Sequence, residues 1–181
     1  SGAAASLTFN VLYVDTTGTT TASRAFTVSS TFQVKNGTLT TSGTNILTAS
    51  VGMTVGDGVG SEGTAILALS GPVTLKITAG QTFSVNATDG KLTSVASGGT
   101  PTLTSTTTSA MTATVSGVVD IDALNFSYGG ANGLKIVHVA QSVSVKNVTF
   151  SNVDATANSR HLTIESPGAA FAFPGCVFGA L

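Results

Sequence analysis

Apolar and polar residues alternate along much of the chain in short runs that end at glycine, asparagine, aspartate or serine. Such runs occupy residues 7–13, 26–34, 73–77 and 83–85. A period of two predicts β-strands, because successive side chains of a strand point to opposite faces. We find no segment with the 3.6-residue apolar stripe of an amphipathic helix. The pattern therefore predicts an all-β fold.

Three segments in the last third of the chain can be superimposed, at residues 119–126, 143–150 and 171–178. In each, an apolar pair spaced two apart is followed by two intervening residues and a second apolar pair. A further strand repeats in the same register, because Leu134-Lys135-Ile136 aligns with Leu162-Thr163-Ile164. The last third of the chain is therefore predicted to consist of successive copies of one structural unit.

Each superimposed segment is also expected to contain a bend. A straight strand would send Val145 and Val148 to opposite faces, although both side chains are apolar. We therefore predict a corner at Lys146-Asn147. Equivalent corners are predicted at Asp122-Ala123 and Pro174-Gly175, since Asn, Gly and Pro favour turns.

A repeat of roughly 24 to 28 residues with about three short strands is typical of one turn of a parallel β-helix. We predict a single parallel β-solenoid domain over residues 1–181, with residues 1–31 as a less regular β segment or an N-terminal cap. Between residues 40 and 113 the irregular spacing predicts only further strands. A β-sandwich with hairpins is the alternative, and the scarcity of Asn-Gly and Asp-Gly turns disfavours it.

This strand–corner–strand pattern in residues 115–181 resembles the right-handed parallel β-helix superfamily, the pectate-lyase-like group of enzymes, adhesins and passenger domains. Residues 32–39 fit the same pattern. The resemblance implies a right-handed coil and a protein that is secreted or displayed at the cell surface. It also draws attention to outward-facing Asp, Lys and Arg, which polysaccharide lyases and hydrolases of the superfamily use for catalysis.

Asp120 and Asp122 are the candidates for such chemistry, with Lys146 beside them. Both carboxylates flank the inward Ile121 and should face outward, about 7 Å apart, a spacing that suits acid/base catalysis or calcium. Lys146 aligns with Asp122 one coil away, so a surface ion pair worth about 0 to 1 kcal/mol is the favoured interpretation. The paired-Asp and Gly-His-Gly signatures of pectin hydrolases are missing.

The remaining candidate sites are weaker. A Gly-rich segment carries Asp57 and Glu62, which could hold calcium, although a flexible loop is the default. His138 and His161 have no neighbours at metal-ligand spacing, and we expect His161 to be an exposed loop residue. Cys176 is expected to be a small inward hydrophobe, and a single cysteine excludes an internal disulfide. Four Asn-x-Ser/Thr sequons are candidates for glycosylation: Asn36, Asn86, Asn125 and Asn147.

Composition limits the partners that can be expected. Charged residues make up 8% of the chain and the formal net charge is −1, so no basic patch is available for nucleic acid. The mean hydropathy is +0.39, but the longest apolar run, residues 168–181, contains Pro174 and is shorter than the roughly 20 residues of a spanning helix. We therefore predict no transmembrane segment, and no cofactor is indicated.

Three functions remain open. The leading hypothesis is an extracellular structural or adhesive solenoid that associates end to end with copies of itself, because the last coil is left open at residue 181. The second is a carbohydrate-binding or carbohydrate-cleaving β-helix, for which surface glycans would be partners; Tyr13 and Tyr128 are the only tyrosines and tryptophan is absent. The third is ice binding through Thr-x-Thr rows such as 102–104 and 112–114, although the coils that can be aligned show no fixed Thr-x-Thr register.

Overall fold

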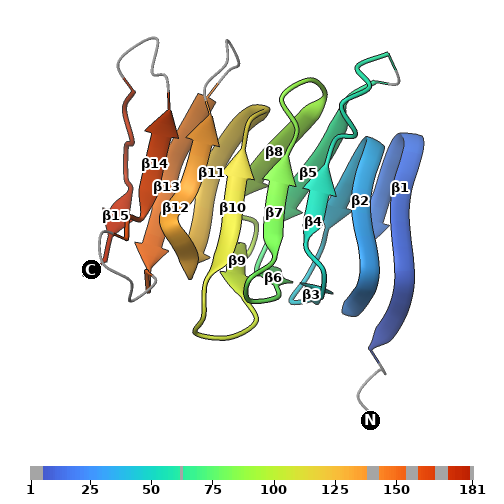
Figure 1. The fold of residues 1–181 in the computed structure, drawn as a ribbon, viewed down its shortest axis with the longest axis horizontal. Coiled ribbons are helices and arrows are strands. Elements are labelled where there is room, and N and C mark those ends of the chain that lie inside the picture. The colour runs from blue at the N-terminus through green and yellow to red at the C-terminus, as the bar shows by residue number, and fades with distance from the viewer. Residues whose placement is uncertain (1–5, 62, 138–142, 154–158, 166–170, 180–181) are drawn as a thin grey trace.

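A computed structural model describes residues 6–61, 63–137, 143–153, 159–165 and 171–179. Within these ranges the fold is all-β, and 15 strands in one continuous sheet coil into a parallel β-solenoid of about six turns. Every strand pairing is parallel. Figure 1 shows the coils stacked along the long axis, with the earliest strands at one end and the latest at the other. The predicted fold class is confirmed.

The strands in chain order are β1 (Leu7–Ala22), β2 (Phe26–Thr41), β3 (Ile46–Ala49), β4 (Met53–Val55), β5 (Ala65–Ser70), β6 (Thr74–Ile77), β7 (Thr82–Val85), β8 (Gly90–Val95), β9 (Thr102–Ser105), β10 (Met111–Val115), β11 (Val118–Ser127), β12 (Gly129–Val137), β13 (Val143–Ser151), β14 (Leu162–Glu165) and β15 (Val177–Phe178).

Three walls surround the core. Wall 1 runs from the starts of β1 and β2 through β3, β6 and β9 to the second halves of β11 and β13 and then β15. Wall 2 contains β4, β7, β10, β12 and β14 and forms the front layer in Figure 1. Wall 3 contains β5, β8 and the first halves of β11 and β13. The long strands β1, β2, β11 and β13 therefore bend across more than one wall.

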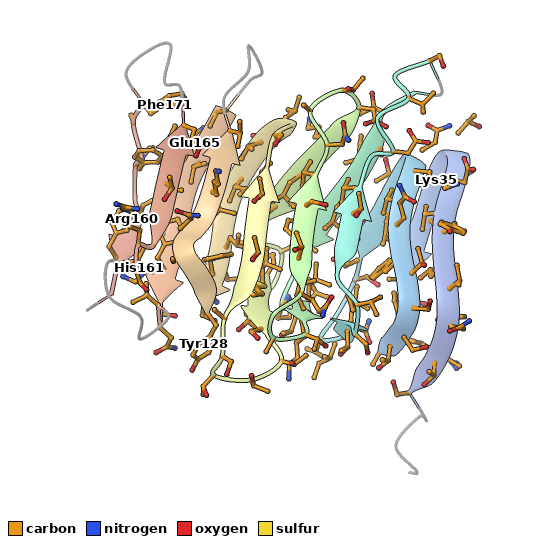
Figure 2. The ribbon with its side chains drawn as sticks, viewed as in Figure 1. Lys35, Tyr128, Arg160, His161, Glu165 and Phe171 are labelled. Atoms are coloured by element: carbon orange, nitrogen blue, oxygen red, sulfur yellow. The ribbon has the colours of Figure 1, made fainter. Side chains whose placement is uncertain are left out.

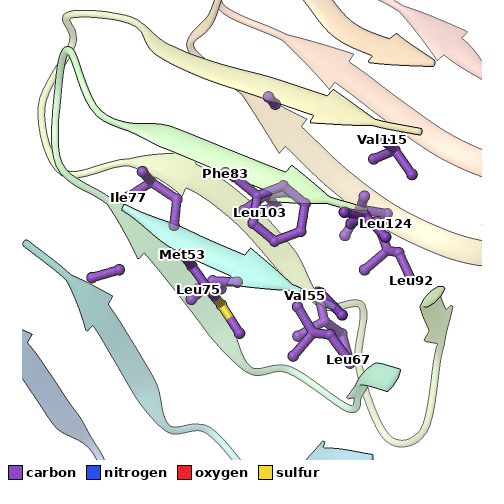
Figure 3. Packing of buried hydrophobic residues seen from close by; sticks show 14 of the residues in the cluster. Met53, Val55, Leu67, Leu75, Ile77, Phe83, Leu92, Leu103, Val115 and Leu124 are labelled. Carbon is purple, nitrogen blue, oxygen red and sulfur yellow. The ribbon is translucent and has the colours of Figure 1, made fainter. Parts of the chain in front are cut away.

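Inward side chains form columns along the axis, because strand pairing keeps the same register from coil to coil. One column on wall 1 contains Leu7, Phe26, Leu47, Leu75, Leu103, Phe126, Phe150 and Phe178. One column on wall 2 contains Val14, Val34, Val55, Val85, Val115, Ile136 and Ile164. Figure 3 shows members of several columns meeting in the interior. Burial of each fully covered member of these columns contributes about 1.5 to 3 kcal/mol.

Coil length varies more than the sequence predicts. Val14 and Val34 are neighbours in adjacent coils, and so are Val55 and Val85, so the later coil is half as long again as the earlier one. The repeat length expected from the last third of the chain is therefore too narrow for the whole solenoid. The extra residues are accommodated in loops at the corners, as between β4 and β5. The strands of the walls stay aligned, because a slip of one residue would turn their apolar side chains outward.

The aligned registers and the corners are confirmed. Asp122 pairs with Lys146, and Phe126, Phe150 and Phe178 stack in successive coils. The backbone turns at Ala123 (φ 83°), Asn147 (φ 51°) and Gly175 (φ 69°), one residue in each of the three predicted corners. The left-handed conformation at these positions reverses the parity of the strand, so that apolar residues on both sides of the corner point inward.

Ala123→Gly is expected to stabilise the protein by about 1 kcal/mol. A residue that carries a β-carbon pays about 1 to 2 kcal/mol to adopt the left-handed backbone conformation, and glycine does not. Urea unfolding followed by circular dichroism would measure the shift. Ala68→Gly, at an outward position within β5, is the matched control and should lower stability by about 0.5 to 1 kcal/mol. Equal losses in both variants would contradict the corner assignment.

Candidate functional site

The two candidate catalytic carboxylates lie on the outside of wall 3. Asp120 and Asp122 are exposed and flank the buried Ile121, as expected. The carboxylate of Asp122 accepts a hydrogen bond from Nδ2 of Asn147 at 2.7 Å. Lys146 lies next to Asp122 in the register, but among the described residues the ion pair that forms is Lys135 with Glu165, at 2.8 Å on wall 2. The prediction of an ion pair between Asp122 and Lys146 is therefore wrong, because Asn147 at the corner binds the Asp122 carboxylate instead.

The cross-strand neighbours of Asp120 in the adjacent coils are uncharged. Its partners in the adjacent coils are Thr93 on β8 and Ser144 on β13. Within the described ranges, no group of three or more His, Cys, Asp or Glu side chains is placed to hold a metal ion. The arrangement offers two solvated carboxylates and hydroxyl groups on a convex wall.

The Gly-rich loop after β4 is closed by carboxylate–amide hydrogen bonds. Asp89, which is 6% exposed, accepts from the backbone N–H of Asp57 at 2.9 Å and of Gly58 at 3.2 Å. The carboxylate of Asp57 accepts from the N–H of Val59 at 2.8 Å, so it serves the turn. Glu62 lies outside the described residues. The sequence gives no signal for this role of Asp89, since its partners Asp57 and Gly58 come from the preceding coil.

Asp89→Ala is expected to lower the free energy of unfolding by about 2 kcal/mol, because two hydrogen bonds to a charged acceptor are lost. Asp89→Asn keeps one acceptor oxygen and should lose about half as much. Asp120→Ala on the exposed wall is the control and should change stability by less than about 0.5 kcal/mol. Urea unfolding measures the stability of all three variants. A loss of stability in Asp120→Ala as large as that in Asp89→Ala would contradict the role of Asp89 in holding the loop.

The four candidate glycosylation asparagines occupy different surroundings. The Oδ1 of Asn36 accepts from the N–H of Gly37 at 2.8 Å, and the Oδ1 of Asn86 accepts from the N–H of Thr88 at 2.9 Å. Asn125 is half-buried on wall 1. Asn147 is exposed at its corner, where its amide reaches Asp122. The first two side chains therefore hold turns, and Asn147 is the most open of the four.

The prediction that His161 is an exposed loop residue is wrong. His161 is 8% exposed rather than solvated, because its Nε2 lies 3.0 Å from the carbonyl oxygen of Gly179 and its ring lies beside the stacked rings of Phe150 and Phe178. Figure 2 shows Arg160 and His161 together at this end of the stack. His138 lies outside the described residues. Cys176 is half-buried and packs against the core.

The tyrosines form no shared platform for stacking sugars. The ammonium group of Lys35 lies 4.5 Å from the centre of the Tyr13 ring at the N-terminal end. Tyr128 occupies a corner between β11 and β12 with φ 57°. The two rings therefore belong to coils far apart in the stack, and one already carries a cation over its face.

Hydroxyl groups line up along wall 1, where Thr104 is buried at 9% exposure and its hydroxyl bonds with that of Ser127. One row contains Thr27, Thr48, Lys76, Thr104, Ser127 and Ser151, and the adjacent row contains Ile46, Thr74, Thr102, Asn125 and Thr149. Thr102 and Thr104 thus align with Asn125 and Ser127 and then with Thr149 and Ser151. The Thr112–Thr114 row lies on wall 2 instead, so the two Thr-x-Thr rows do not share a wall.

Both ends of the solenoid carry an apolar hollow. The hollow in the first coil has a volume of about 230 Å³ and is lined mainly by Leu7, Phe9, Leu12, Phe26 and Leu39. The hollow at the other end has a volume of about 490 Å³, and Ser159, Arg160 and His161 line it together with Leu162, Phe178 and Gly179.

The described part of the chain has no helix long and apolar enough to cross a membrane. The geometry of these residues shows a parallel β-solenoid with apolar residues exposed at both ends and hydroxyl-rich walls. No protein-family model matches the chain, and neither does any curated protein or solved structure.

Proposed function

We propose that this chain is an extracellular structural module that serves as a stiff spacer in a stalk, filament or passenger domain at the cell surface. The observation that carries the proposal is the continuous core. Inward columns on walls 1 and 2 run from β1 to β15 and from β1 to β14, although the β1–β2 and β10–β12 pairings contain local register shifts. Each coil therefore buries its apolar face only against its neighbours, as in other linear repeat architectures.

The direction of the hydrogen bonds supports a mechanical role. In a parallel solenoid the strands lie across the axis, so the backbone hydrogen bonds between coils lie along it. A pull along the axis therefore loads the bonds of all three walls at once. The walls themselves are dominated by Thr, Ser and Val, with charged residues at only 8% of the chain, so salt and pH act on few groups.

Single-molecule pulling by the two ends would test the spacer function. We expect the chain to lengthen in steps, each releasing about one coil, because nearest-neighbour contacts between repeats fail one at a time. Release of oligosaccharides from a polysaccharide, abolished by Asp120→Asn with Asp122→Asn in a folded protein, would overturn the spacer in favour of a pectate-lyase-like enzyme. Binding on a glycan array that the same pair abolishes would overturn it in favour of a carbohydrate-binding or adhesive solenoid.

Ice binding is a second candidate, and the hydroxyl rows of wall 1 favour it. Adjacent rows lie about 6.6 Å apart along the strands, and successive coils lie about 4.8 Å apart. Water oxygens on the prism faces of ice repeat in a rectangular lattice close to these two spacings. Hydroxyl and methyl groups of threonine in such an array can replace the water molecules of that surface. Lys76 interrupts the array at its centre.

Lys76→Thr is expected to increase thermal hysteresis several-fold, because it extends the partly exposed threonine row of Thr27 and Thr48 by one coil. Thr102→Lys should abolish the effect, whereas Thr112→Lys on wall 2 is the matched control and should leave it unchanged. Thermal hysteresis and ice recrystallisation would be measured side by side for the three variants. Equal activity in all of them would remove the second candidate.

A further inference from the structure

The two ends of the solenoid expose the same part of the core. Leu7 is 46% exposed at one end, and Phe178 is 50% exposed at the other. They are the first and last members of the same wall 1 column, whose six members between them are at most 7% exposed. The column therefore presents an apolar face at each end that further β-coils can cover.

The two end faces both expose apolar side chains of the same column. Phe178 belongs to the coil after that of Leu162, and its ring stacks on Phe150 with the ring centres 5.0 Å apart and the planes 3° apart. The ring is half exposed at the C-terminal face, where it borders the hollow of about 490 Å³. The opposite face carries the hollow of about 230 Å³ in the first coil, where Leu7 lies at the rim and Phe26 belongs to the next coil inward.

The backbone edges at the two ends also match. Among the described strands, β1 pairs on one side only, with β2, and β15 pairs on one side only, with β13. Both free edges belong to a stack in which every pairing is parallel, so they run in the same direction. Free edges of this kind can accept another strand from a partner that presents the same direction.

We propose that a second copy of this chain covers each end, with Phe178 of one molecule entering the first-coil hollow of the next and meeting Leu7. A second copy is the partner that offers the same strand direction, the same three-walled cross-section and the other end of the same column. The contact is head to tail, so it does not close on itself and builds a filament. This joint rests on the proposed spacer function and names its partner.

Substitutions at each end test the joint without disturbing the buried core. Leu7→Lys and Phe178→Lys place a charge at exposed positions and should each convert a concentration-dependent association into a monomer. Val95→Lys is the matched control, because Val95 is 51% exposed on wall 3, and it should associate as the unmodified chain does. Sedimentation velocity over a range of concentrations measures the change, and circular dichroism confirms that each variant is folded.

Mixing the two end variants gives a sharper result. Each variant keeps one intact end, so Leu7→Lys and Phe178→Lys molecules should be monomers alone and should form dimers, and nothing longer, when mixed. An unmodified chain that stays monomeric at high concentration would overturn the joint, as would association in only one of the two variants or its loss in Val95→Lys. Stepwise lengthening of such a monomer under force would leave the spacer function standing, so the same pulling experiment separates failure of the joint from failure of the spacer.

Discussion

Replacing Phe83 by alanine is expected to lower the free energy of unfolding by about 3 to 5 kcal/mol, the range for deleting a buried phenyl ring. Phe83 lies on β7 in the middle of the stack and is fully buried. Its column neighbours are Met53 in the preceding coil and Ala113 in the following one. Since Ala113 is small, the ring supplies much of the volume at this level of the core, and its loss leaves a cavity.

The size of this effect can be checked against variants on the same two strands. Thr82→Ala removes an exposed side chain next to Phe83 and should change stability by less than about 0.5 kcal/mol. Phe83→Ala combined with Ala113→Phe restores the total volume one coil away and should recover part of the loss. Urea unfolding of the four proteins measures these values. A loss below about 1 kcal/mol in Phe83→Ala would contradict the packing of the central coil.

The sequence predicted the walls better than the coil lengths. Alternating apolar residues identify the inward columns because a strand has a period of two, and the parity switch at Asn147 identified a corner that the backbone confirms with φ 51°. The coil lengths could not be predicted in residues 40–113, where a loop such as that after β4 adds residues between strands without changing the register. Pattern matching at a fixed spacing fails when insertions occur at corners.

Contacts between coils were the part of the candidate site that the sequence could not reveal. Lys146 was correctly aligned with Asp122, yet the neighbouring Asn147 reaches the carboxylate because the corner turns its side chain back toward the preceding coil. Asp89 holds a loop of the coil before it, and His161 is covered by Gly179 from later in the chain. Each of these contacts joins residues from different coils, whose relative height is set only when the solenoid forms.

Gly117→Ala is expected to be among the most destabilising single substitutions outside the apolar columns. A β-carbon at Gly117 would lie 2.1 Å from the carbonyl oxygen of Gly90 and 2.3 Å from that of Asn86. Both obstacles are backbone atoms of the preceding coil, which cannot move aside as a flexible side chain can. The substitution must push β8 and β11 apart where they pair, so we expect a loss of about 3 kcal/mol or more, the upper part of the range for overpacking.

Gly18 provides a matched control for the substitution at Gly117. Neither Gly117 nor Gly18 needs a left-handed backbone, and a β-carbon at Gly18 would meet only Thr16 Oγ1 at 3.9 Å. Gly18→Ala should therefore leave stability within about 0.5 kcal/mol of the unmodified chain. Both variants replace glycine by alanine, so the difference in their stabilities, measured by urea unfolding, reports the effect of the close approach between coils at Gly117. If Gly117→Ala were as stable as Gly18→Ala, the coils would be spaced more widely at this corner than the strand register requires, and the continuous core that the spacer function depends on would be broken there.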